Sequence, residues 1–309
     1  MKFAIGAGLL LLVAAPPFMS SWLVFLLGTS IAKGMVILGV VLLLRGGLIS
    51  FGHALYYAAG AYVVGFAANR FGISDAAITL PLAAAGCALL GVLVGLLLTR
   101  FRGIYFAMLS LAFSMILYTV LLKFYDFSGG TDGLSVRHFS VFGVRPPQEW
   151  LRLSQYYLAL ALGFGMLVVG TRFLASPLGT LMQAVRYNEI RIEYLGASVS
   201  RAILASYVLS AAVSGVGGGL SAYLVGHVSP QLAYWTTSGD FVFVAVLGGA
   251  GSVFAPFAGS IVFEFVKNYA VKYSPETWQL TLGVFLLVII FFLPQGLWSL
   301  ADRLRRARA

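Results

Sequence analysis

The residues of this sequence that could do chemistry are the few ionisable side chains that interrupt its long apolar runs. Lys33 lies about halfway along the run Trp22–Leu44, and Glu264 lies near the end of a later run. If these runs cross a bilayer, a charge within them is costly and by default marks a transport path. Lys33 could neutralise the carboxylate of a transported solute. Alternatively, it pairs with Glu264 or a backbone carbonyl, or its amine reaches the membrane surface.

Four further polar residues are candidates for a solute path. Ser50 and His53 belong to a glycine-rich stretch that could leave helical geometry, which a membrane tolerates only where the backbone lines a cavity or is buried in protein. Tyr57 and Ser110 complete the set. The alternative for His53 is a hydrogen-bonded packing role. For Tyr57 and Ser110 it is an interhelical hydrogen bond, worth well under about 2 kcal/mol.

Patterns for nucleotide binding, metal binding and covalent catalysis are missing from the sequence. There is no phosphate loop of the form G-x-x-x-x-G-K-[ST], no cluster of Cys and His with zinc-ligand spacing, and no grouping typical of a catalytic triad. We therefore predict no catalytic residue, no metal site and no cofactor in this chain. Any dependence on ATP and Mg²⁺ must then come from partner subunits.

The elements that position these residues are predicted to be membrane-spanning helices. Hydrophobic residues make up 60% of the chain and charged residues only 10%, and the mean hydropathy is +0.95. A soluble domain carries roughly 25% charged residues. Runs such as 76–98 have the length of about 20 residues that a spanning helix needs, whereas a membrane β-barrel would show short alternating segments. The composition predicts an all-α polytopic membrane protein.

About ten transmembrane segments are expected, in a single domain of residues 1–309. They are 3–19, 22–44, 48–68, 76–98, 103–124, 154–174, 203–224, 241–250, 253–267 and 279–298. We interpret the first as a retained helix, because Pro16 and Pro17 interrupt a signal-peptide cleavage site. With GGAGS as a tight turn between two short spans, both termini lie in the cytoplasm. The excess of Lys and Arg behind the net charge of +10 then gathers on the cytoplasmic side, as expected of a membrane protein, and does not indicate nucleic-acid binding.

Two connections are long enough to carry partner contacts. Residues 125–152 form a periplasmic loop whose SGGTDG sequence supplies turn chemistry. Its Thr131, Asp132 and Arg137 are candidates for docking another protein, the alternative being a solvated loop. Residues 175–202 form a cytoplasmic loop that contains AVRYNEIRIEYLGASVSRAIL. The small-residue run GVGGGLSAYL that follows, at 215–224, predicts close helix packing.

The cytoplasmic loop has the pattern of a helix lying across the mouth of the protein. Ser176 and Pro177 form a helix-start signature, apolar residues recur at helical spacing over 181–195, and Gly196 then breaks the helix. Acidic residues balance basic ones on its polar face, which favours a protein partner over anionic lipid. The candidate contact residues are Arg186, Asn188, Glu189, Arg191, Glu193, Leu195 and Gly196.

This segment resembles the cytoplasmic coupling loop of ABC-importer permeases, and most closely that of the permease family for branched-chain amino acids (LivH/LivM type). RGGLISFGHALYYAAGAYVVGF, FRGIYFAMLSLAFSMILY with the later SGGTDGL, FVFVAVLGGAGSVFAPFAGSIVFEFV and FLPQGLW are similar to further motifs of that family. The resemblance covers most of residues 30–298, in order. It departs at Ala255, where the family usually has Gly before Pro, and at Lys33, where the family usually has a small or apolar residue.

The resemblance implies an ABC-importer permease fold and the function of a permease subunit. The subunit would work by alternating access in an ATP-driven importer for branched-chain or hydrophobic amino acids, or for a related small carboxylate or amide. Implied partners are two cytoplasmic ABC ATPase subunits, a homologous second permease, a periplasmic or lipid-anchored solute-binding protein and membrane lipid, but no nucleic acid. The implied location is a bacterial or archaeal cytoplasmic membrane. Asn188, Glu189, Leu195 and Gly196 would belong to the ATPase contact.

Two other classes of protein fit the residues less well. An ion-coupled secondary transporter usually carries several carboxylates or histidines deep in the membrane, and here only Glu264 and His53 qualify. A membrane enzyme would need catalytic residues grouped at one membrane face, and no such group is present in the sequence.

Overall fold

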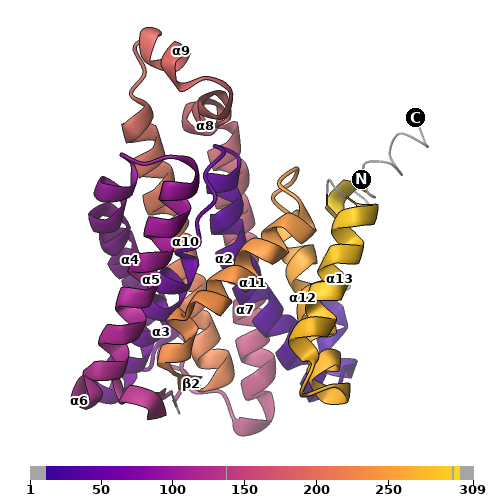
Figure 1. The fold of residues 1–309 in the computed structure, drawn as a ribbon. Helices are drawn as coiled ribbons and strands as arrows, with labels where there is room; N and C mark the ends of the chain where they lie inside the picture. The colour runs from indigo at the N-terminus through magenta and orange to yellow at the C-terminus, as the bar shows by residue number, and fades with distance from the viewer. Residues whose placement is uncertain (1–11, 137, 294–295, 300–309) are drawn as a thin grey trace.

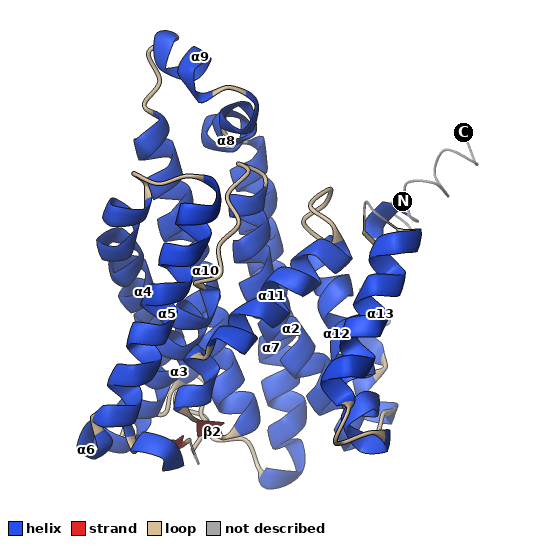
Figure 2. Cartoon of the chain, viewed as in Figure 1, coloured by secondary structure: helices blue, strands red, loops and turns tan. Residues whose placement is uncertain are grey.

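The computed structural model describes residues 12–136, 138–293 and 296–299. Most of the predicted first span, the basic C-terminal tail and Arg137 lie outside these ranges. The described chain is a bundle of helices, with a single two-stranded antiparallel sheet at one end (Figure 1, Figure 2). The predicted all-α membrane architecture is therefore confirmed.

The long helices follow the predicted spans closely in most places. They are α2 (Ser21–Leu44), α3 (His53–Arg70), α4 (Ala76–Leu98), α5 (Gly103–Lys123), α7 (Gln148–Ala175), α10 (Val199–Val225), α11 (Trp235–Gly248), α12 (Ala255–Tyr273) and α13 (Trp278–Phe292). The short elements are η1 (Pro16–Phe18), α6 (Tyr125–Ser128), η2 (Gly130–Asp132), β1 (Leu134–Ser135), α8 (Pro177–Tyr187), α9 (Glu189–Tyr194), β2 (His227–Val228) and η3 (Pro230–Ala233). By length and composition, α2, α4, α5, α7 and α10 could each cross a membrane.

Helices α2 and α10 form the centre of the bundle. Their most apolar windows are 94% and 72% buried, against 33% or less for α4, α5 and α7. The outer helices turn large apolar side chains outward, such as Leu89 and Leu93 on α4 and Met108 on α5. A helix that is apolar on all sides suits either a buried position or contact with lipid, and the bundle contains both kinds.

Two half-length helices, α3 and α11, differ from the predicted spans at their starts. The run predicted as 48–68 becomes helical only at His53. Helix α11 begins at Trp235, before the predicted span 241–250, and follows β2 and η3. We call the segments that precede these helices, residues 45–52 before α3 and 226–234 before α11, their lead-ins. The lead-in to α3 comes from the end of the bundle that carries α8 and α9, and the lead-in to α11 comes from the β2 end (Figure 1). The two half-helices meet, because the Ala54 N–H donates to Ser238 Oγ at 3.1 Å.

Helix α5 holds both lead-ins. Ser110 Oγ accepts a hydrogen bond from the Phe51 N–H at 3.0 Å, and Ser114 Oγ donates to the Ala233 carbonyl at 2.8 Å. Non-helical backbone inside a membrane needs such internal partners because lipid supplies none. Ser110 and Ser114 are four residues apart, so they share one face of α5.

The order of elements in α2–α5 recurs in α10–α13, with the chain running in the opposite direction (Figure 1). Each set has a central helix, a lead-in, a half-helix and two further helices. Helix α2 packs on α12, and α10 packs on α4 in the corresponding way. Such inverted repeats are typical of transporters, whose binding sites lie where the repeats meet.

The backbones of α3 and α10 are in direct contact, as the run GVGGGLSAYL predicted. A Cβ atom on Gly218 would lie 1.9 Å from the Tyr57 carbonyl oxygen, and one on Gly60 would lie 2.1 Å from the Gly215 carbonyl oxygen. Only glycine allows this approach, which is how small residues drive packing between membrane helices.

Candidate functional site

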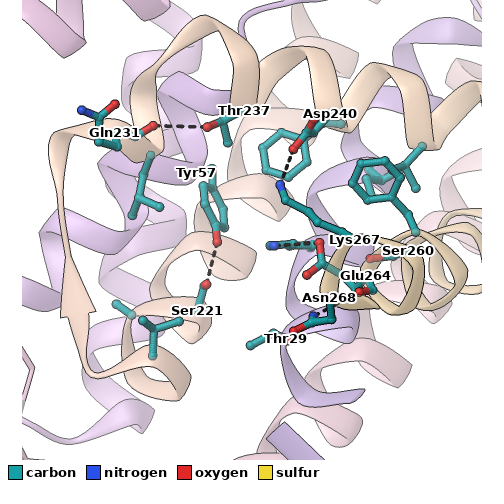
Figure 3. Close-up of a pocket in the computed structure, with 18 of the residues that line it drawn as sticks. Thr29, Tyr57, Ser221, Gln231, Thr237, Asp240, Ser260, Glu264, Lys267 and Asn268 are labelled. Carbon is teal, nitrogen blue, oxygen red and sulfur yellow. Dashed lines mark hydrogen bonds and ion pairs between the residues drawn. The ribbon is translucent and has the colours of Figure 1, made fainter. Parts of the chain in front are cut away.

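A cavity of about 340 Å³ lies among five helices from both repeats (Figure 3). Its lining combines charged, hydroxyl and aromatic side chains with aliphatic ones. The lining residues come from α2, α3, α10, α11, α12 and the β2–η3 lead-in. The cavity therefore lies where the repeats meet.

Two ion pairs line this cavity. Lys33 Nζ lies 2.7 Å from Glu264 Oε1, and Lys267 Nζ lies 2.7 Å from Asp240 Oδ2. Lys33 is about 18 Å along α2 at 1.5 Å per residue, near the middle of the helix. The structure therefore confirms the pairing alternative for Lys33, and it also places Lys33 at the cavity wall.

The lysine of the second pair also lies near two aromatic rings. Lys267 Nζ is 5.1 Å from the centroid of the Trp278 ring and 5.8 Å from that of Phe263. A lysine within about 6 Å of an aromatic face is held by the negative charge of that face. Asp240 and the two rings are thus the favourable neighbours of this cation.

Sequence reasoning missed Asp240 and Lys267 because both stood at the predicted ends of spans. The predicted spans 241–250 and 253–267 begin just after Asp240 and end at Lys267, so neither charge stood out within a span. In the structure α11 begins at Trp235 and α12 continues to Tyr273, so both residues lie inside helices. The three-residue spacing of Glu264 and Lys267, on one helix face, was the available signal.

The five predicted path residues divide into two groups. Tyr57 joins Lys33 at the cavity, and its hydroxyl is 2.6 Å from Ser221 Oγ. The other three, Ser50, His53 and Ser110, do not line the cavity. His53 Nε2 is 2.6 Å from Ser210 Oγ, in a fully packed environment.

The segment predicted as one helix over 181–195 is two helices. The chain is extended at Asn188, with φ −162° and ψ 100°, and the Asn188 side chain accepts a hydrogen bond from the Arg191 N–H at 3.0 Å. Asparagine is among the best residues for starting a helix in this way, and periodicity alone does not reveal such a break. The predicted start at Ser176 is confirmed, since its Oγ accepts from the Gly179 N–H at 3.2 Å. The predicted break at Gly196 is also confirmed, with φ +85°.

The two short helices present one apolar face to the bundle and another away from it. Met182, Val185 and Ile192 are buried. Facing away is a group of residues that we call the α8–α9 surface: Tyr187, Ile190, Tyr194 and Leu195, whose exposed fractions are 88, 67, 88 and 78%. Leu195 was one of the predicted contact residues, and the others named with it, Arg186, Asn188, Arg191, Glu193 and Gly196, are also exposed. Exposed apolar groups rimmed by polar ones mark sites of interaction with a protein or a membrane.

Glu189 connects this segment to α5. Its carboxylate accepts hydrogen bonds from Arg102 Nε at 2.7 and 3.0 Å, and it is half-buried. Arg102 is the residue immediately before α5, and its guanidinium also donates to the carbonyls of Thr99 and Phe101. Arg102 thus links α9 to the residue that precedes the first turn of α5.

At the β2 end, the 125–152 loop is fixed to the bundle. β1 pairs with β2, with Leu134 opposite Val228. The docking candidates Thr131 and Asp132 lie exposed in η2, and Asp132 Oδ2 accepts from the Tyr125 hydroxyl at 3.2 Å. The third candidate, Arg137, lies outside the described residues.

Asp75 fastens the later part of this loop. It caps α4 through the Ala77 N–H and also accepts from the N–H groups of Phe142 and Gly143. Partial burial raises the pKa of the Asp75 carboxyl, but the three backbone donors outweigh this and hold the pKa below its usual range.

Comparison with known proteins gives a consistent picture. The family model described as branched-chain amino acid transport system / permease component matches residues 22–293. The chain is 31% identical over 313 residues to the high-affinity branched-chain amino acid transport system permease protein LivM of Escherichia coli (strain K12), covering 94% of this chain and 73% of that protein. It is also 31% identical over 272 residues to the LivM protein of Salmonella typhimurium, covering 81% of this chain and 64% of that protein. No solved structure shows a significant match.

Proposed function

Because the chain belongs to the family of branched-chain amino acid transport system permease components, we propose that it is a membrane-spanning subunit of an ATP-driven importer for branched-chain amino acids. The family consists of permease components, so the chain is not itself an enzyme. ATP and Mg²⁺ are bound by partner ATPase subunits in this proposal. The partners are two such ATPases, a second, homologous permease and a solute-binding protein.

The observation that carries this proposal is the α8–α9 surface. Helices α8 and α9, which carry its exposed aromatic and aliphatic side chains, lie at one end of the bundle (Figure 1), where a water-soluble partner can cover them. In the proposal this end faces the cytoplasm and contacts the ATPase, with both termini also cytoplasmic. The β2 end faces outward, and its Thr131, Asp132 and Arg137 are the proposed contact for the binding protein. The membrane is the cytoplasmic membrane of a bacterium or archaeon.

The contacts described above supply a route from the ATPase to the membrane interior. Arg102 joins Glu189 of α9 to the start of α5, and Ser110 and Ser114 of α5 hold the lead-ins of α3 and α11. Non-helical lead-ins can rearrange without breaking a helix, and half-helices of this kind line the path in other transporters. Movement of α9 would thus reposition both half-helices, which changes access to the cavity between them.

An ion-coupled mechanism has less support. In the described parts of the membrane helices, the two carboxylates at the cavity, Asp240 and Glu264, each have a lysine partner. Coupling to an ion gradient usually relies on several carboxylates or histidines deep in the membrane. The other candidate from the sequence, His53, lies against Ser210 and outside the cavity.

Uptake of radiolabelled leucine into proteoliposomes tests the proposal. The vesicles contain this chain with its ATPase, second permease and binding protein, and ATP is enclosed in one set and omitted from another. The proposal predicts uptake only where the ATPase can hydrolyse ATP, with no effect of collapsing the Na⁺ and H⁺ gradients. Uptake that survives without ATP and disappears with the gradient would establish the ion-coupled alternative.

A further inference from the structure

We propose that the cavity enclosed by α2, α3, α10, α11 and α12 binds a zwitterionic α-amino acid, whose carboxylate and ammonium are recognised by the Lys33–Glu264 and Lys267–Asp240 pairs. This inference rests on the proposed transport function and adds to it a specific binding site within this chain. It is independent of the α8–α9 surface.

The cavity has the dimensions of a small-ligand site. Its volume of about 340 Å³ falls in the range of roughly 300–1,000 Å³ common for small-molecule pockets. Such pockets are mainly apolar, with a few polar groups that fix the orientation of the ligand. Here Ile37, Phe241, Val244 and Phe263 provide apolar wall, which suits an aliphatic side chain.

The charges of the cavity favour a ligand that carries both signs. Two lysines and two carboxylates line one space, so their formal charges cancel. A ligand with only a carboxylate would meet two negative charges as well as two positive ones. An α-amino acid can place its carboxylate against a lysine and its ammonium against Glu264 or Asp240, and each such charge-assisted hydrogen bond is stronger than a neutral one.

The pairs are reachable from the cavity. The side chain of Lys33 is 26% exposed, and those of Lys267 and Asp240 are 26% and 30% exposed, whereas Glu264 is 8% exposed. Figure 3 shows Tyr57 and Ser221 beside these pairs. Their linked hydroxyl groups offer a further donor and acceptor on the facing wall.

The connectivity of the pairs gives a bound amino acid a mechanical effect. Glu264 and Lys267 share one face of α12, yet each pairs with a different helix: Glu264 with α2 and Lys267 with α11. A zwitterion that inserts between the charges takes over part of each cross-helix contact. Occupancy would therefore loosen α12 from α2 and α11, in the region that includes one of the two half-helices.

The test is equilibrium binding of labelled leucine to the assembled transporter complex in nanodiscs, with the soluble binding protein left out. Competitors are 4-methylpentanoate, which has the carboxylate alone, and 3-methylbutylamine, which has the ammonium alone. We expect both to compete at least about tenfold more weakly than leucine, because each forms one charge-assisted contact in place of two.

Paired substitutions remove the charges without leaving one unpaired. Lys33→Met with Glu264→Met should weaken leucine binding at least about tenfold, and such a replacement of a buried pair by apolar residues is commonly tolerated by the fold. Exchange of the partners, Lys33→Glu with Glu264→Lys, keeps both charges and should restore binding to within a few fold. Lys272→Met on the same helix is the matched control, because Lys272 does not line the cavity, and it should bind leucine normally.

Three results would overturn the inference: no leucine binding by the unsubstituted complex, normal binding by the Met pair, or equal competition by 4-methylpentanoate. Failure here is distinct from failure of the proposed function. If ATP-driven uptake persists while the Met pair binds leucine normally, the transport proposal stands and this site does not.

Discussion

Replacing Gly218 by alanine should separate α3 from α10 and destabilise the protein. The added Cβ would lie 1.9 Å from the carbonyl oxygen of Tyr57 and 2.7 Å from its carbonyl carbon. Both are backbone atoms, so no side chain can turn away. An ordinary Cβ contact is at least 3.4 Å, so the helices must move apart locally by about 1.5 Å, a displacement that packed interiors resist.

The expected cost follows from two opposing effects. Overpacking a well-packed interior costs roughly 1–3 kcal/mol, and this contact belongs at the upper end because backbone meets backbone. Alanine offsets up to about 1 kcal/mol by its better helix propensity. The net loss is about 2 kcal/mol, equivalent to a fall in Tm of several degrees at roughly 2–4 °C per kcal/mol. Leucine binding should weaken as well, because Tyr57 lines the cavity.

A thiol-reactive fluorophore provides the assay, because Cys87 is the only cysteine of the chain and is buried. Heating exposes it on unfolding. Gly165→Ala in α7 and Gly283→Ala in α13 are matched controls, since a Cβ at either position meets no atom within 4 Å. They should melt at or above the temperature of the unsubstituted protein. If Gly218→Ala melts with these controls, the close contact between α3 and α10 is wrong.

Three further predictions concern the two ends of the bundle. Glu189→Arg should place a second cation beside Arg102 and abolish leucine-stimulated ATP hydrolysis by the assembled complex. Adding Arg102→Glu should restore this hydrolysis in part. An unchanged rate of hydrolysis in the single variant would exclude the route through α5. Asn188→Ala should cost about 1 kcal/mol of local stability by removing the cap of α9, seen as faster tryptic cleavage within α9, and equal cleavage rates would contradict this capping role. Because the pKa of Asp75 is depressed, its stabilising contacts are complete above the usual pKa of aspartate and are lost as the pH falls through the lowered value. Amide exchange at Gly143, corrected for its intrinsic pH dependence, should therefore accelerate on acidification in the unsubstituted protein. In Asp75→Ala this exchange should be fast at every pH.

Hydropathy located the spans accurately where the helix is continuous. Helix α4 occupies Ala76–Leu98, the predicted range, because an uninterrupted apolar run follows a capping aspartate. The same signal could not show where α3 and α11 begin. LISFG is as apolar as the helix that follows it, and its non-helical form depends on a hydrogen bond from the Phe51 N–H to Ser110, far away in the sequence. The first turns of α11, WTTSGD, are polar, so hydropathy placed the start of this helix at 241 in place of Trp235.

Some of the charged site residues could be predicted from the sequence and others could not. Lys33 was recognised because a lysine in the middle of an apolar run has no local explanation, and Glu264 was named as one of its alternative partners. Asp240 and Lys267 were not recognised because they stood at the boundaries of the predicted spans 241–250 and 253–267. The pattern of residues 181–195 predicted a helix, but the break at Asn188 depends on its side chain accepting a hydrogen bond from the Arg191 N–H.

The most direct test of the account is whether the α8–α9 surface transmits ATP hydrolysis to transport. The variant Tyr194→Asp with Leu195→Asp changes two side chains that are 88% and 78% exposed, so the fold should not depend on them. The control is Phe71→Asp, at a residue that directly follows the last residue of α3 and is 75% exposed. We predict that the double variant loses both co-purification with the ATPase and ATP-driven leucine uptake, while Phe71→Asp still co-purifies with the ATPase. Normal co-purification and uptake in the double variant would contradict the account.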